Sequence, residues 1–298
     1  MVRRFAVTAF GIVRGVLGDT GNPEGEHKAV LSLGGHPRLA TVTTPYDATR
    51  HTQTHKVFTH LYGFHGKEPI TKGIGGFDSH QRGVCIGWRR TVVGAATLDT
   101  WHMKGCSQRI SPDVVSETVS PAGLPSHSLR VRWCAADGSE FLSETRRLTL
   151  LPDTDGVRWV EVDSTLSCTA APVRLLGDPH HAGLHVRLAN EVCRHPWNTR
   201  YTIPSGARWG RDDCVHGAWW VLCRFVVRSK TRWLLFMTRP GHQSPPIYSA
   251  RAYGKLGAFV EGTAAERPFR IQCKLGLSEH SLDGQACNRL FQAMNWDD

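Results

Sequence analysis

The sequence contains no long apolar segment and no paired cysteines. Its longest apolar runs, residues 218–227 and 233–237, contain or adjoin an arginine and fall far short of the ~20 apolar residues that a membrane-spanning helix needs. We therefore expect no membrane-embedded role. The nine cysteines are scattered singly, without the C-x-x-C pairs of zinc ribbons or the spacing of a disulfide framework. Reduced thiols are typical of the cytoplasm, and we predict a cytoplasmic location.

Lysine is scarce, since the chain has 8 lysines among 36 basic residues. The 26 acidic residues leave a net charge of +10. Because the basic residues are spread along the chain with no block of five or six, we expect no nucleic-acid partner. Two interpretations of the charge remain. Either an arginine-rich composition gives a basic surface without a function, or the chain carries a basic site for an anionic or carboxylated substrate.

Nucleotide-binding and serine-hydrolase motifs are also missing. Residues 73–76 are rich in glycine, but the Gly-x-Gly-x-x-Gly and Gly-Lys-Ser/Thr patterns are absent and no helix is expected to follow. No Gly-x-Ser-x-Gly turn, which would present a nucleophilic serine, occurs in the chain. These absences argue against a nucleotide-dependent enzyme and against an α/β-hydrolase.

What the sequence does contain is a series of β-type segments separated by turn residues. Asp137-Gly138 between two alternating segments is a strong hairpin signal. The pattern predicts an all-β protein, a large antiparallel β-sandwich with one short C-terminal helix at 282–294. We expect a single domain over residues 1–298, with residues 1–55 as an N-terminal edge layer. The predicted strands include 129–135, 140–150, 157–168, 173–176, 219–227, 231–238, 257–261 and 269–277, whereas 111–126, which contains three prolines, is expected to be looser.

A glycine-rich turn at residues 73–76 leads to His80 and Arg82 and then to an apolar segment at 84–88. That segment alternates with the period of two expected of a strand. His80 and Arg82 are two residues apart, so they would share one face if the extended geometry begins before Gly83. We predict a functional site at this strand boundary.

A second segment, residues 181–188, has one apolar and one polar face. Its polar face holds His181, His185 and Arg187, so both histidines are predicted to point the same way as two positions of one groove. A solvated outer face of a strand is the alternative interpretation. His102, at the end of another segment, adds a further imidazole. Histidine titrates near neutral pH and is suited to general acid and base catalysis.

A third segment contains Arg251 and Tyr253, which are also two residues apart. A guanidinium group matches a carboxylate or a pair of hydroxyls with two hydrogen bonds, and tyrosine can donate a proton. The alternative is ordinary packing at the start of a strand, with the tips of both side chains in water.

Several short motifs occur in a fixed order and cover about residues 55 to 294. They are Gly66-Lys67-Glu68-Pro69-Ile70-Thr71-Lys72-Gly73, Gly75-Gly76, Ser79-His80-Gln81-Arg82-Gly83, Ile86-Gly87-Trp88, Asp99-Thr100-Trp101-His102, Gly177-Asp178, His181-Ala182-Gly183, Arg187, Pro196-Trp197-Asn198 and Arg251-Ala252-Tyr253-Gly254. In these motifs the chain resembles the bacterial family of unknown function labelled PmoA-like. Gln81 stands where that family usually has a second histidine.

The PmoA label refers to a methane oxygenase subunit, which should be a membrane protein. This chain has no apolar segment long enough to span a membrane, so we set the label aside. The resemblance implies instead a β-sandwich similar to mutarotase-like supersandwiches and an association with sugar catabolism.

The leading hypothesis is a carbohydrate-acting enzyme, a lyase, hydrolase or epimerase on a sugar, a glycoside or an oxidised sugar. Its predicted catalytic residues are His80, His181 and Tyr253. The predicted substrate-binding residues are Arg82, Trp101, His185, Arg187 and Arg251, with Trp101 stacking on a sugar ring. No cofactor is identified with certainty. One divalent metal ion is the candidate, with His80, His102 and His181 as its ligands.

The alternative hypothesis is a glycan-binding β-sandwich without catalytic activity. A shared active site requires His80, His102 and His181 to lie within about 10 Å of one another in a concave pocket, whereas a binding module does not. The sequence does not determine the oligomeric state.

Overall fold

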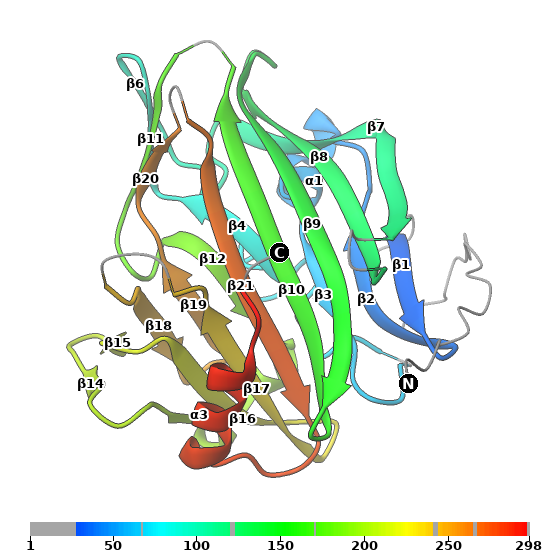
Figure 1. The fold of residues 1–298 in the computed structure, drawn as a ribbon. Coiled ribbons are helices and arrows are strands. Elements are labelled where there is room, and N and C mark those ends of the chain that lie inside the picture. Colours follow the sequence, from blue (N-terminus) through cyan, green and yellow to red (C-terminus); the bar gives the residue numbers. More distant parts are fainter. Residues whose placement is uncertain are drawn as a thin grey trace.

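The computed structural model describes residues 28–66, 68–119, 123–169, 171–240, 244–264 and 267–296, and only the backbone of residues 28 and 111–119. Most of this part of the chain forms three sheets of nine, eight and four strands, and the neighbouring strands among the described residues pair antiparallel. The two large sheets lie one behind the other in Figure 1. The protein is therefore the all-β antiparallel sandwich that the sequence predicts.

The nine-stranded sheet carries the residues of the candidate site. Its strands, in spatial order, are β1 (Lys28–Leu33), β2 (His36–Val42), β3 (Thr59–Leu61), β4 (Val84–Trp88), β12 (Ala182–Arg187), β19 (Lys255–Phe259), β18 (Ile247–Arg251), β15 (Cys214–His216) and β14 (Arg208–Trp209). β1 and β2 lie at one edge. Residues 1–27 of the predicted N-terminal edge layer lie outside the described residues. At the centre, β4 pairs with β12 although they are far apart in the sequence.

The eight-stranded sheet contains the long hairpins. In spatial order its strands are β13 (Arg200–Thr202), β16 (Trp220–Val227), β17 (Lys230–Thr238), β21 (Phe269–Ser278), β10 (Val157–Cys168), β9 (Glu140–Thr154), β8 (Pro125–Ala135) and β7 (Cys106–Val119). The hairpin predicted at Asp137-Gly138 joins β8 to β9. The prediction of a looser segment at 111–126 is wrong, because β7 continues to Val119. β7 is the edge strand of this sheet, and an edge strand tolerates proline because one of its sides lacks a pairing strand. Its pairing with β8 is irregular between Ile110 and Val115.

The third sheet is small, and the helices are few and short. The sheet consists of β20 (Gly262–Ala264), β11 (Val173–Leu176), β5 (Arg90–Val93) and β6 (Ala96–Leu98). The helices are η1 (Ala48–Arg50), α1 (His51–Thr54), α2 (Asn190–Arg194), η2 (Pro196–Asn198) and α3 (Gly284–Ala293). None of the helices among the described residues has the length and apolar character needed to cross a membrane.

The C-terminal helix α3 forms where the sequence predicts it. Asp283 caps its first turn by accepting a hydrogen bond of 2.7 Å from the backbone N–H of Ala286. Cys287 and Leu290 on its buried face pack with Trp159 and Trp220 of the eight-stranded sheet, forming a second core on the outer side of that sheet (Figure 1).

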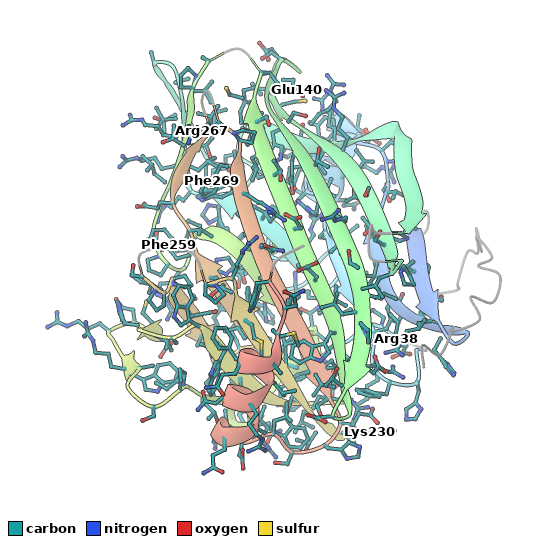
Figure 2. The ribbon with its side chains drawn as sticks, in the orientation of Figure 1. Arg38, Glu140, Lys230, Phe259, Arg267 and Phe269 are labelled. Carbon is teal, nitrogen blue, oxygen red and sulfur yellow. The ribbon has the colours of Figure 1, made fainter. Side chains whose placement is uncertain are left out.

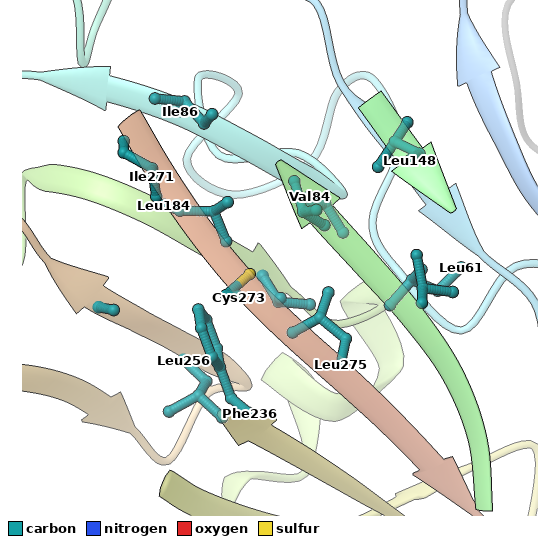
Figure 3. Close-up of a cluster of buried hydrophobic side chains, with 14 of the residues drawn as sticks. Leu61, Val84, Ile86, Leu148, Leu184, Phe236, Leu256, Ile271, Cys273 and Leu275 are labelled. Atoms are coloured by element: carbon teal, nitrogen blue, oxygen red, sulfur yellow. The ribbon is translucent and has the colours of Figure 1, made fainter. Parts of the chain in front are cut away.

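The main core lies between the two large sheets. Ile86 and Leu184 of the nine-stranded sheet lie opposite Ile271 and Leu275 of the eight-stranded sheet, all at 5% exposure or less (Figure 3). Burying a side chain of this size contributes about 1.5–3 kcal/mol. At the rim, Arg38 on β2 lies beside the end of β9 (Figure 2) and forms an ion pair of 3.1 Å with Asp153. Each of the nine cysteines is a free thiol.

Candidate functional site

The candidate site is built on the outer face of the nine-stranded sheet. Along β12, Leu184 and Val186 belong to the main core, and strand alternation places His185 and Arg187 on the opposite face. On this face His185, Arg187 and their neighbours contact side chains from four other segments, which are residues 55–58, 72–82, 99–105 and 177–181. The alternation predicted for residues 181–188 is therefore present.

Two glycines leave room for aromatic rings to lie directly on the sheet. A Cβ atom at Gly257 would lie 2.0 Å from Nδ1 of His185, and one at Gly87 would lie 2.6 Å from the backbone oxygen of Thr100. His185 therefore lies over Gly257, and the Trp101 segment lies over Gly87. The His185 and Trp101 ring centroids are 4.5 Å apart with an interplanar angle of 68°. His185 and Trp101 are both buried.

Three imidazoles gather beside Trp101, and we call His80, His102 and His181 the histidine rim. The ring centroids of His80 and His102 are 4.5 Å apart, and those of His102 and His181 are 5.7 Å apart. His80 and His181 lie 6.3 Å and 6.0 Å from the Trp101 ring. The three histidines come from separate segments, and neighbouring rings of the rim lie within 5.7 Å of one another, inside the ~10 Å that a shared site requires.

Two of the rim histidines are held by aspartates three residues earlier in the chain. Asp99 accepts a hydrogen bond of 2.7 Å from Nδ1 of His102, and Asp178 accepts one of 2.8 Å from Nδ1 of His181. A carboxylate at Nδ1 favours the tautomer that carries its proton there, so the lone pair is on Nε2. The His102 and His181 side chains are 25% and 30% exposed. The repeated Asp-x-x-His spacing is a sequence signal for this pair that our predictions did not use.

Three buried lysines surround these rings and were missed by the sequence predictions. The Nζ atoms of Lys56 and Lys255 each lie 5.1 Å from the Trp101 ring centroid. Lys56 donates a hydrogen bond of 2.6 Å to the Trp101 carbonyl, and Lys255 donates one to the His180 carbonyl. Lys72 donates to the carbonyl of Gln81 at 3.0 Å. The scarcity of lysine was the available signal, since three of only eight lysines lie here.

The burial of these groups determines their charge. Burial lowers the pKa of Lys255 to about 7, and that of Lys56 and Lys72 to about 8. Burial, followed by the charges of Lys56 and His102, lowers the pKa of His80 to about 2. Burial also lowers the pKa of His181 and outweighs its hydrogen bond to Asp178, which raises it. His80 and His181 are therefore neutral near pH 7.

Cations form a row across three neighbouring strands next to the rings. Arg187 on β12 is paired directly with Lys255 on β19, and Lys255 is paired with Arg251 on β18. Like charges in directly opposite positions destabilise a sheet. Arg251 forms an ion pair of 3.2 Å with Asp213, whose side chain is 57% exposed. Arg187 stacks on Tyr253, with 4.7 Å between the guanidinium carbon and the ring centroid.

Two predicted substrate-binding residues have surroundings that differ from those expected. His80 and Arg82 do not share a strand face, because residues 78–81 form a turn and β4 begins only at Val84. Arg82 is fully buried, and its guanidinium donates to backbone carbonyls, including that of Ser79 at 2.7 Å. Trp101 is 0% exposed, so neither of its faces is open to a sugar ring.

The histidine rim does not have the geometry of a metal centre. Among the described residues, no three His, Cys, Asp or Glu side chains are arranged to hold a metal ion. A cavity of about 350 Å³ lies elsewhere, between the large sheets, and its lining includes no rim histidine.

The chain matches a model of a protein family. No curated protein matches the chain. A protein-family model, described as a family of unknown function (DUF6807), matches residues 28–277. The matched region contains β1 to β20 and nearly all of β21, and with them every residue of the candidate site. The chain therefore belongs to this family of unknown function, DUF6807.

Proposed function

We propose that the protein is a carbohydrate-acting enzyme, a lyase, hydrolase or epimerase on a sugar or an oxidised sugar. The observation that carries the proposal is the gathering of His80, His102 and His181, with two of the Nδ1 atoms held by aspartates. The resemblance to PmoA-like and mutarotase-like proteins supports the sugar as the substrate class. The free thiols are in keeping with a cytoplasmic location.

In this mechanism His102 and His181 transfer protons through Nε2. Their rings are 5.7 Å apart and partly exposed, so one substrate can lie against both. The neutral imidazole of one accepts a proton from a sugar carbon or hydroxyl, and the protonated imidazole of the other donates one to the leaving or inverted position. The aspartates keep each ring in its orientation and stabilise the imidazolium when it forms.

His80 supports this pair. Its pKa of about 2 makes it a poor acid or base at neutral pH, and its Nε2 atom is buried without a hydrogen-bond partner. A substrate carboxylate close to the lysines would offset the positive charges that lower the histidine pKa values. The pKa values of His80 and His181 would then rise toward neutrality when an anionic substrate binds.

Tyr253 is a proton donor in this scheme. Burial raises the pKa of its phenol, which is therefore protonated at neutral pH. Its side chain is half-buried and stacks on the Arg187 guanidinium, which holds the ring at the edge of the site.

A screen of oxidised and unoxidised glycosides tests the proposal, with His181→Gln as the diagnostic variant. Positioned acid–base groups contribute about 10²–10⁴-fold, so we expect His181→Gln to lose at least about a hundredfold in kcat. The exposed His36 is the matched control, and His36→Gln should stay within about twofold of the parent protein. Equal turnover by both variants on every substrate would contradict the assignment.

A non-catalytic glycan-binding module is the second candidate, and exposed aromatic side chains favour it. Phe77, Trp197 and Trp209 are 67%, 63% and 47% exposed, and aromatic faces of this kind bind the apolar faces of sugars. In that case Trp197→Ala would weaken glycan binding, whereas His181→Gln would retain it and no substrate would be turned over.

A further inference from the structure

We propose that the Nε–Nη2 edge of Arg187 binds the carboxylate of the substrate, and that the substrate is therefore an acidic sugar. The assignment of this carboxylate to a sugar rests on the function proposed above. The carboxylate site itself stands on the contacts of Arg187 and its neighbours.

The free donors of Arg187 have the geometry that a carboxylate requires. Its Nη1 atom donates to the backbone carbonyl of Tyr253, whereas Nε and Nη2 are buried and have no hydrogen-bond partner. Nε–H and Nη2–H lie on one edge of the planar guanidinium, where two parallel hydrogen bonds meet the two oxygens of a carboxylate. An unsatisfied buried donor is costly, and two on one edge indicate a ligand group.

The charge around Arg187 also lacks a counterion. Arg187, Lys72 and Lys255 are each 1% exposed, and none of them forms an ion pair with a carboxylate in the part of the chain that the structure describes. Lys255 is the direct cross-strand neighbour of Arg187, and the backbone N–H of Lys72 donates to the Arg187 carbonyl at 2.9 Å. Burying an unpaired guanidinium or a protonated lysine is strongly unfavourable, and the lowered pKa values of Lys72 and Lys255 reflect this cost. A bound anion offsets that cost.

The other arginines are less suited to be the anchor. Arg82 donates to carbonyls of its own neighbourhood, and Arg251 already has Asp213 as its partner. Beside Arg187, Gln81 is hydrogen-bonded to Tyr253 and keeps its Oε1 atom buried without a donor. Oε1 can accept a hydrogen bond from a hydroxyl, which an acidic sugar carries next to its carboxylate. Because the edge is closed to solvent, we expect a ligand to reach it only if the partly exposed Tyr253 ring moves aside.

Thermal unfolding of the full chain in matched-ionic-strength solutions tests the site. The probes are sodium D-glucuronate, sodium glycolate and sodium acetate as carboxylates, D-glucose as the neutral sugar, and sodium phosphate and sodium chloride as other anions. A ligand that binds only the folded state raises the melting temperature in proportion to ln(1 + [L]/Kd). We expect the carboxylates, glucuronate most of all, to raise it above chloride and phosphate.

Arg187→Lys keeps the charge but removes the two-donor edge, and Arg130→Lys on the exposed surface is the matched control. We expect Arg187→Lys to weaken glucuronate binding at least about tenfold and Arg130→Lys to leave it unchanged. If Arg187→Lys does not fold, the test rests on the parent protein alone, through the order in which the anions raise its melting temperature. The proposal is overturned if no carboxylate exceeds chloride, if phosphate equals the carboxylates, or if folded Arg187→Lys binds glucuronate as well as the parent.

The two proposals fail in different ways. His181→Gln should abolish turnover and leave the carboxylate response intact. A carboxylate response without turnover of any sugar contradicts the enzymatic function alone, and turnover restricted to neutral glycosides contradicts the carboxylate site alone.

Discussion

Gly257→Ala tests the close packing of the His185 ring on the sheet, with Trp101 packed edge-on against it. The added Cβ atom would lie 2.0 Å from Nδ1 and 2.3 Å from Cγ of His185. The ring cannot move away freely, because Trp101 lies against it with a centroid distance of 4.5 Å. Overpacking a buried site costs about 1–3 kcal/mol, and we expect the upper end of this range, about 3 kcal/mol.

The expected shift in melting temperature follows from the size of the protein. An unfolding entropy of ~2.1 cal/mol/K per residue over 298 residues is about 0.6 kcal/mol/K, so 3 kcal/mol lowers the melting temperature by about 5 °C. Calorimetry or circular dichroism measures the shift. Gly284→Ala is the matched control, because its Cβ would meet nothing closer than 3.9 Å. The control should leave stability unchanged or raise it by about 0.4–1 kcal/mol.

A double-mutant cycle identifies the cause of the loss. If the clash with His185 is responsible, His185→Ala removes it, and the double variant is destabilised by less than the sum of the two single variants. A Gly257→Ala protein as stable as Gly284→Ala, or strictly additive effects in the cycle, would refute the packing of His185 on Gly257.

Three further predictions concern the helix, a buried lysine and a rim aspartate. Leu290→Ala should lower the free energy of unfolding by about 2–5 kcal/mol, because Leu290 lies on the buried face of α3. Arg289→Ala on the exposed face of the helix should change it by no more than about 0.5 kcal/mol, and urea unfolding measures both. Burial lowers the pKa of Lys255 from 10.5 to about 7. Between these pH values Lys255 is protonated in the unfolded chain and deprotonated in the folded chain, so it makes the free energy of unfolding rise with pH. Lys255→Met should therefore reduce the slope of unfolding free energy against pH, from pH 7 to 10, by up to ~1.4 kcal/mol per pH unit, and an unchanged slope would show that Lys255 keeps its ordinary pKa. Asp178→Asn removes a hydrogen bond that raises the pKa of His181, so the limb of the pH–rate profile that reports His181 should move to lower pH, while Asp153→Asn should leave both limbs in place.

Local patterns in the sequence predicted much of the fold. The strands at 157–168 and 173–176 begin and end at the predicted residues, because period-two alternation and flanking turn residues are local properties. The helix α3 was predicted for the same reason. The segment 111–126 was not, because proline disfavours a central strand, and only the strand order shows that β7 lies at the edge of its sheet.

The site was predictable only in part. Its histidines, Arg187 and Tyr253 lie in segments whose composition is unusual in itself. Lys56 precedes β3 and Lys255 begins β19, and the two lysines meet at Trp101 because β3, β4, β12 and β19 are neighbours in that order, which a single sequence does not show. The position of Arg82 depends on the turn before β4, where Asp78 has a positive φ of 51°; aspartate adopts such values more often than most residues, but the sequence does not show at which aspartate this happens.

The pairing of β4 with β12 also has a kinetic consequence. β4 ends at Trp88 and β12 begins at Ala182, and the strands β5 to β11 all lie between these two residues in the sequence. Contacts between distant parts of a chain form slowly, because the entropy of closing the long loop is lost before the contacts are gained. We therefore expect the packing of His185 against Trp101 and the row formed by Arg187, Lys255 and Arg251 to assemble late in folding. No fragment that ends before β19 contains the complete site.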